Sequence, residues 1–137
     1  MYPLEFVQPM KIEMTSNGFE ELLTPTAVDE ALKKEGTTLL FINSVCGCAA
    51  STARPGVILS TKGEGKKPTH LTTSFAGYDE AAVKQARTYF MPYPPSSPCI
   101  AILKNGEVIH MVERYQIEGR SPEMIAAALQ AAYNEYC

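Results

Sequence analysis

The segment from Thr37 to Ile42, TTLLFI, constrains the fold more than any other part of the chain because it is almost continuously apolar. A strand with one face in water alternates apolar and polar residues, whereas a strand covered on both faces does not. The segment therefore predicts a central strand with helices on both sides, an α/β fold. The chain has 137 residues, 45% hydrophobic and 20% charged, which suits one domain over residues 1–137.

Apolar periodicity and helix-breaking residues divide the rest of the chain into alternating elements. Helices are expected over residues 3–17, 24–36, 46–60, 79–90 and 121–136, and strands over 37–42, 70–75, 99–103 and 108–112. Asn105-Gly106 between the last two strands is a strong hairpin signal. Pro55 should kink the helix that follows the central strand, because its ring cannot continue the helical hydrogen-bond pattern.

The order of these elements narrows the fold further. A parallel strand pair joined by a helix, followed by a hairpin and a closing helix, is similar to the thioredoxin arrangement, although the order alone also suits other α/β domains. We therefore expect a thioredoxin-like fold, with a central mixed sheet flanked by helices and an N-terminal helical extension.

Charge and hydropathy exclude several kinds of partner. The net charge of −3 argues against binding to nucleic acid or to an anionic membrane, since both require a basic face. No apolar run approaches the roughly 20 residues that span a bilayer, and no signal peptide is visible at the N-terminus. The expected location is cytoplasmic, where closely spaced cysteines are more often catalytic or metal-binding than structural.

Two of the four cysteines, Cys46 and Cys48, lie where the central strand gives way to a helix. The free N–H groups and the positive dipole end of a helix start stabilise a thiolate, which is the attacking form of cysteine. Gly47 suits the small ring of a disulfide across one residue, and strain in such a disulfide favours exchange over a structural role. The pair predicts thiol–disulfide exchange, with Cys46 and Cys48 as catalytic residues.

Two other interpretations of the cysteines stay open. Inert core thiols are disfavoured because loop-forming residues, Asn43 and Ser44, precede the pair. Metal ligation, or a related persulfide-carrying role, is disfavoured because structural zinc sites generally use two cysteine knuckles and the sequence has only one. We expect no bound metal and no bound cofactor. The ligands in the metal alternative would be Cys46, Cys48, Cys99 and perhaps Cys137.

Ser97-Pro98-Cys99 begins a segment similar to the one in thioredoxins that starts with a cis proline and runs into the hairpin. In that fold the proline loop faces the redox cysteines and offers its backbone to a substrate chain. We therefore favour a cis Ser97–Pro98 bond, although most bonds before proline are trans. Ser97, Pro98 and Cys99 are candidate substrate-binding residues, together with Gly47 and Arg54.

The segments NSVCGCAA (residues 43–50) and ARP (residues 53–55) resemble the signature of the bacilliredoxins, a thioredoxin-fold family of bacillithiol-using bacteria with a Cys-Gly-Cys motif. The resemblance covers nearly the whole chain. Further matches lie at Pro9-Met10, Gly18–Leu22, Phe75–Gly77, Pro95–Pro98, Ile117–Gly119 and Cys137.

The resemblance implies a function and its partners. The clients would be bacillithiolated or misoxidised cytosolic proteins, and bacillithiol, a low-molecular-weight thiol, would be substrate and reductant. Cys46 would take bacillithiol from the client as its own adduct, and Cys48 would resolve that adduct or assist its release. A general protein disulfide isomerase or reductase activity is also ascribed to the family and stays an alternative. The expected oligomeric state is a monomer or weak dimer.

Three residues are harder to interpret. Cys99 stands where the family usually has serine, and we favour a small buried strand residue over a redox role. Arg54 either steers anionic bacillithiol or, as we favour, is a solvated surface arginine. Cys137 resolves adducts, links two chains, or is simply an exposed end. Thioredoxins also bury an aspartate beneath the redox cysteines, but the strand over 37–42 contains none.

Overall fold

A computed structural model of the protein describes residues 1–137. The helical elements are α1 (Leu4–Thr15), α2 (Pro25–Leu32), the π-helical turn η1 (Ala49–Ala53), α3 (Arg54–Ser60), α4 (Glu80–Phe90), α5 (Arg114–Ile117) and α6 (Pro122–Tyr136). The strands are β1 (Glu20–Glu21), β2 (Thr37–Asn43), β3 (His70–Phe75), β4 (Cys99–Lys104) and β5 (Glu107–Val112). No helix combines the length and apolarity that crossing a membrane requires.

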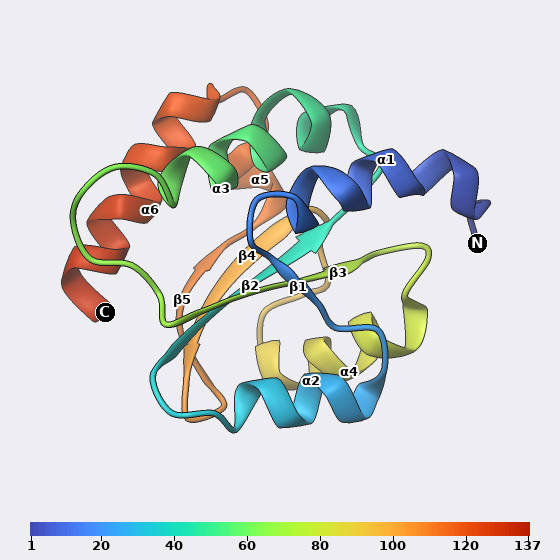
Figure 1. The fold of residues 1–137 in the computed structure, drawn as a ribbon, viewed down its shortest axis with the longest axis horizontal. Coiled ribbons are helices and arrows are strands. Elements are labelled where there is room, and N and C mark those ends of the chain that lie inside the picture. The colour runs from blue at the N-terminus through green and yellow to red at the C-terminus, as the bar shows by residue number, and fades with distance from the viewer.

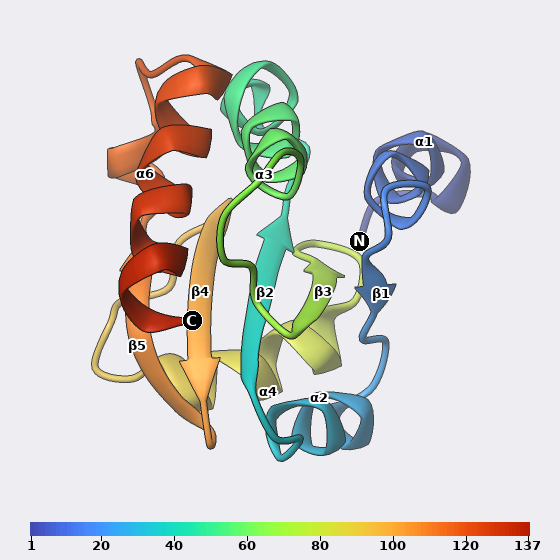
Figure 2. The same ribbon diagram turned by 60° about the vertical axis from the view of Figure 1, so that its left-hand side comes forward.

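The strands form one mixed sheet in the order β1-β3-β2-β4-β5. The central strand β2 runs parallel to β3 and antiparallel to β4, and all of its residues are buried. The hairpin of β4 and β5 turns at Asn105 and Gly106, both with positive φ, as the Asn-Gly signal predicted. Helices cover the two faces of the sheet (Figures 1 and 2), with α3 and α6 on one face and α2 and α4 on the other.

Alternation along β2 divides the core into two clusters. Leu39 and Phe41 join the cluster formed with α3 and α6, whereas Leu40 and Ile42 join the cluster formed with α2 and α4. Successive side chains of a strand point to opposite faces, so one apolar run supplies both clusters. The prediction of a central strand covered on both sides is confirmed.

The starts of α2 and α6 follow from their capping residues. Thr24 Oγ1 accepts a hydrogen bond from Ala27 N, and Ser121 Oγ accepts one from Met124 N. A proline follows each cap, where its missing N–H costs nothing. Both starts agree with the sequence.

The structure differs from the sequence-based map in three places. The short strand β1 and the short helix α5 were not predicted. The segment after Cys46 is not one α-helix with a kink at Pro55, as the sequence predicted. Instead the π-helical turn η1 ends just before α3, and Pro55 lies in the first turn of α3. A π-helical turn is one of the ways in which a helix absorbs an irregularity next to proline.

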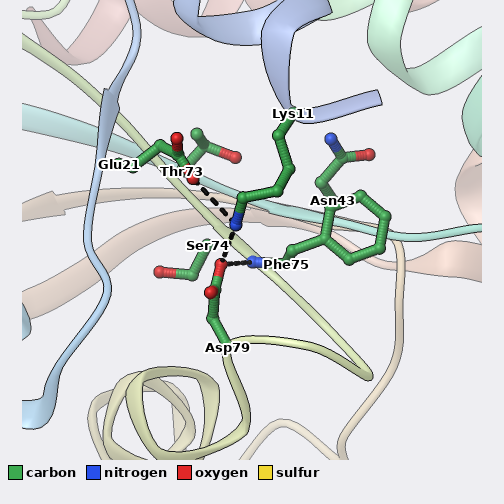
Figure 3. A pocket seen from close by; sticks show the side chains of 7 residues that line it. All are labelled: Lys11, Glu21, Asn43, Thr73, Ser74, Phe75 and Asp79. Carbon is green, nitrogen blue, oxygen red and sulfur yellow. Dashed lines mark hydrogen bonds and ion pairs between the residues drawn. The ribbon is translucent and has the colours of Figure 1, made fainter. Parts of the chain in front are cut away.

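A buried ion pair attaches α1 to the sheet and to the start of α4 (Figure 3). Lys11 Nζ lies 2.7 Å from Asp79 Oδ2 and 2.8 Å from Glu21 Oε2, and Asp79 Oδ2 also accepts a hydrogen bond from Phe75 N. Burial disfavours the charged lysine, but hydrogen bonds and charges of the two carboxylates outweigh that effect and raise the pKa of Lys11. The network fixes the N-terminal helical extension predicted from the sequence.

Replacing Lys11 with Met should lower the free energy of unfolding by about 3–5 kcal/mol, because the buried carboxylate of Asp79 loses its counter-charge. Urea denaturation measures the change. Lys84→Met, an exposed change on α4, is the control and should stay within about 0.5 kcal/mol of the parent. The double variant Lys11→Met/Asp79→Asn should lose less than the two single losses added together, and strict additivity would contradict the pairing.

Candidate active site

The first helical turn begins at Cys46. The Cys46 carbonyl accepts hydrogen bonds from Ala49 N at 2.9 Å and from Ala50 N at 3.3 Å. The Cys46 N–H in turn donates to Ser44 Oγ at 3.1 Å. The chain therefore leaves β2 through a two-residue loop and enters a helix at the first cysteine, where the sequence placed it.

Gly47 lies on the surface between the two cysteines. Its φ is not positive, and a Cβ at this position would meet nothing within 4 Å. The conformation with free thiols therefore does not require glycine. The argument that glycine eases the small ring of a Cys46–Cys48 disulfide stays a prediction about the oxidised form.

The two thiols are free, half-buried and close together, with 2.7 Å between Cys46 Sγ and Cys48 Sγ. Burial disfavours the Cys46 thiolate, but hydrogen bonds from the thiol and the backbone N–H of Cys48 outweigh it and lower the pKa of Cys46. The positive charge of Arg114 and the N–H of Ala49 act in the same direction. The lowered pKa is the direction predicted from the helix start.

The pKa of Cys48 moves the opposite way, to about 11. Burial is the main cause, followed by the hydrogen bond to Cys46 and the negative charge that Cys46 carries when ionised. The same two sulfurs thus have distinct roles at neutral pH. Cys46 is the thiol that ionises first, and Cys48 stays protonated and can donate a hydrogen bond to it, so the role of Cys46 as nucleophile stays a prediction that these shifts favour.

The proline loop lies at the same edge of the sheet as the thiols. Cys99 pairs with Ile42 in the sheet, so Ser97 and Pro98 continue past the end of β2 toward the loop that precedes Cys46. The Ser97–Pro98 peptide bond is cis, as we favoured from the sequence. Pro98 is buried and Ser97 is partly exposed. The position agrees with the predicted role of the loop, and contact with a substrate stays a prediction.

Arg114 is a site residue that the sequence did not single out. It begins α5, its terminal nitrogen Nη1 donates to the Ser97 carbonyl at 3.3 Å, and its charge favours the thiolate of Cys46. A four-residue helix is too short to show periodicity. The sequence feature that could have indicated this helix is its capping box. The Glu113 side chain accepts a hydrogen bond from the Gln116 backbone N–H, and the Gln116 side chain accepts one from the Glu113 backbone N–H.

The expectation of a solvated Arg54 was wrong, because the side chain is only 3% exposed. Its Nη1 donates to Asn43 Oδ1 at 3.1 Å and to the Ser44 carbonyl at 2.8 Å. Its Nε donates to Glu13 Oε1 on α1 at 3.2 Å. The guanidinium therefore holds the loop before Cys46 from inside the protein, and direct steering of substrate by Arg54 stays a prediction without support from these contacts.

Cys99 lies apart from the redox pair. It is 2% exposed and belongs to the core cluster of α2 and α4, whereas Cys46 packs against the cluster of α3 and α6 on the other face. Burial raises the pKa of Cys99 to about 11, so the thiol is protonated. The interpretation as a buried strand residue is confirmed, and the candidate role of the Cys99 thiol in substrate binding is not supported by its position.

Cys137 lies at the opposite end of β2 from Cys46. Thr37 Oγ1, at the start of β2, donates to Cys137 Sγ at 3.3 Å. The seven residues of β2 separate its two ends by roughly 20 Å. Cys137 therefore cannot resolve an adduct on Cys46 within the same chain. No group of three or more His, Cys, Asp or Glu side chains is arranged to hold a metal ion, so the ligand set of the metal alternative is not assembled.

Replacing Cys48 with Ala should raise the pKa of Cys46, because the variant lacks the thiol hydrogen bond that favours the Cys46 thiolate. The measurement is the rate of iodoacetamide alkylation against pH, with the modified residue located by mass spectrometry. Cys99→Ala is the control and should leave the Cys46 profile unchanged, since Cys99 lies across the sheet. An unchanged midpoint in Cys48→Ala would contradict the assignment.

Replacing Arg54 with Met should lower the free energy of unfolding by about 1–3 kcal/mol, because buried acceptors at Asn43 and Ser44 lose their donor. It should also raise the pKa of Cys46 as the loop loosens. Arg54→Lys should recover part of both effects. Lys62→Met is the exposed control. A stability loss with an unchanged alkylation profile would show that Arg54 does not position the cysteine.

Solved structures share this fold at low sequence identity. Mitochondrial thioredoxin 3 from Saccharomyces cerevisiae has a TM-score of 0.56 at 12% identity, covering 90% of this chain and 98% of that one. Thioredoxin O2 from Arabidopsis thaliana has a TM-score of 0.53 at 16% identity, covering 86% and 96%. The predicted thioredoxin-like fold is confirmed.

Sequence relatives are much more similar. The sequence model of a family described as "Disulphide isomerase" matches residues 2–137. A bacilliredoxin from Cytophaga hutchinsonii is 56% identical over 135 residues, covering 98% of this chain and 99% of that protein. A bacilliredoxin from Bacillus cereus is 50% identical over 133 residues, covering 97% and 92%. The chain therefore belongs to the bacilliredoxin family and is a thiol–disulfide oxidoreductase with a redox-active Cys-Gly-Cys site.

Proposed function

We propose that this protein removes bacillithiol from mixed disulfides on cytoplasmic proteins. The observation that carries the proposal is the pair of thiols 2.7 Å apart with opposite pKa shifts, at the start of a helix. Family membership supports bacillithiol as the substrate, since relatives at 50% and 56% identity are named bacilliredoxins.

The first step is attack of the Cys46 thiolate on the bacillithiol sulfur of the mixed disulfide. A Cys46–bacillithiol disulfide forms, the bond between bacillithiol and the client breaks, and the client cysteine leaves as a thiolate that takes up a proton. The Cys48 thiol and two backbone N–H groups favour the thiolate of Cys46 and lower its pKa, which increases the fraction of the attacking form.

The second step uses the change in charge that the first step causes. Burial is the largest cause of the raised pKa of Cys48 and stays unchanged, and the next two causes are its hydrogen bond to Cys46 and the negative charge of Cys46. Both weaken once Cys46 is part of a disulfide, whereas the positive charge of Arg114 still favours a Cys48 thiolate. Cys48 then becomes able to attack Cys46 Sγ, which releases bacillithiol as a thiol and leaves a Cys46–Cys48 disulfide. Two equivalents of a low-molecular-weight thiol, bacillithiol itself, reduce that disulfide to the two thiols and are oxidised to bacillithiol disulfide.

A second candidate function is disulfide isomerisation on misoxidised proteins, and the description of the matching family favours it. The same nucleophile serves both activities. The two activities differ in the sulfur that leaves. In removal of bacillithiol the client cysteine leaves, whereas in isomerisation the client stays bound to Cys46 as a mixed disulfide. The cis-proline loop beside the site is suited to pairing with an extended client segment.

The Cys48→Ala variant distinguishes the two functions. Incubation with a bacillithiolated protein should give a product heavier by one bacillithiol, with the added mass on Cys46, because the resolving thiol is absent. Cys46→Ala is the matched control and should gain no mass. A lasting disulfide between the variant and the client protein would favour the isomerase, and no adduct of either kind would contradict both functions.

A further inference from the structure

Arg114 is an exposed cation at the edge of the sheet where the thiols lie. The end of β2, the start of β4 and the end of β5 meet at this edge, because Cys99 pairs with Ile42 and Ile100 pairs with Val112. Arg114 follows the end of β5 by two residues. The register therefore places it beside the cis-proline loop, which in turn lies beside the loop that leads to Cys46.

The contacts of Arg114 leave part of its guanidinium free. Nη1 donates to the Ser97 carbonyl at 3.3 Å, and Nε lies 3.6 Å from Glu118 Oε2. No protein acceptor bonds to the other terminal nitrogen, and the side chain is 45% exposed. A guanidinium carries five N–H donors in a planar fork that matches a carboxylate. The long, exposed contact to Glu118 is weak and can exchange for a carboxylate of a ligand.

Two other cations of this region, Arg54 and Arg87, are not available in the same way. Arg54 is buried and bonded to Asn43, Ser44 and Glu13. Arg87 is partly buried on α4 and donates to the Ser96 carbonyl at 3.1 Å. The positive charge of Arg114 acts to lower the pKa of both Cys46 and Cys48.

We propose that Arg114 is a specificity-determining residue that binds a carboxylate of the incoming disulfide, so that the site selects anionic, carboxylate-bearing low-molecular-weight thiols over neutral or cationic ones. The inference deepens the proposed function, on which it rests for the identity of the natural thiol. Glu118 competes for the same donors and sets the strength of the preference. The exchange chemistry itself is unchanged, since Arg114 takes no part in bond formation.

The test measures the rate at which three small disulfides oxidise the reduced protein. The probes are 3,3′-dithiodipropionate, 2-hydroxyethyl disulfide and cystamine, which are anionic, neutral and cationic at neutral pH. Each rate constant is divided by the fraction of Cys46 present as thiolate, taken from the alkylation profile of the same variant. The parent protein should react fastest with the anionic probe and slowest with the cationic one, and added salt should reduce the difference.

Arg114→Gln should slow the anionic probe by about tenfold, the effect of losing one charge-assisted hydrogen bond. The corrected rate with the neutral probe should not change, and the rate with the cationic probe should rise. Arg114→Lys should recover part of the preference. Glu118→Gln should speed the anionic probe while leaving the Arg114–Ser97 contact in place. Lys104→Gln removes an exposed positive charge at the far end of β4 and is the charge-matched control, with no effect expected.

Equal slowing of all three probes by Arg114→Gln would overturn the inference and leave Arg114 only an indirect role. No change with any probe would overturn it as well. The results of this test and of the test of the proposed function can differ, so each proposal can fail without the other. A charge preference that depends on Arg114, in a protein whose Cys48→Ala variant takes up no bacillithiol, would support this inference and refute that function. Uptake of bacillithiol without any charge preference would do the reverse.

Discussion

The buried guanidinium of Arg54 is the constraint on which the rest of the site depends. A charge can be buried only when its hydrogen bonds are satisfied, and Arg54 satisfies them with the Asn43 side chain, the Ser44 carbonyl and Glu13. These partners come from the end of β2, the loop after it and α1. The contacts hold the loop in a conformation in which the Cys46 N–H donates to Ser44 Oγ and the helix starts at Cys46.

The surroundings of Cys46 and Cys48 then shift the pKa values of these two thiols in opposite directions. Cys46 receives the first-turn N–H groups, and Cys48 lies within hydrogen-bond distance of it, so ionisation of Cys46 suppresses ionisation of Cys48. Burial is the largest cause of the raised pKa of Cys48 and persists throughout, but the contribution of the Cys46 charge exists only while Cys46 is a thiolate. In the proposed mechanism a mixed disulfide on Cys46 removes that contribution, which favours attack by Cys48 when there is an adduct to resolve.

The parts of the fold predicted correctly from the sequence are those determined by burial of apolar side chains or by local turn chemistry. The central strand over residues 37–42, the Asn105-Gly106 hairpin and the helix starts near residues 24 and 121 belong to this group. The short strand β1 was missed because it contains only Glu20 and Glu21, residues that strands usually lack. Its place is set by pairing with β3, which is a long-range contact without a local signal.

The arginines of the site could not be assigned from sequence patterns for a different reason. A pattern shows which positions carry charge, but a charge becomes buried only when partners from distant segments meet it. Glu13 and Arg54 are 41 residues apart, and the residues near each of them in the sequence do not indicate the contact. The expectation of a solvated Arg54 failed for this reason, and steering of substrate by Arg54 stays a prediction that its buried contacts do not support. The position of the Cys-Gly-Cys motif at a helix start could be predicted, because the strand, the loop and the helix start follow one another along the chain.

The sheet also explains why four cysteines give only one reactive pair. Cys99 is on β4, but its side chain enters the core cluster on the face opposite to the one that Cys46 contacts. Cys137 is held by Thr37 at the other end of β2. A thiolate attacks a disulfide only when the sulfurs can meet, so the separation by face and by end limits exchange to Cys46 and Cys48. The protein can therefore carry extra cysteines without forming alternative intramolecular disulfides, as long as the sheet stays folded.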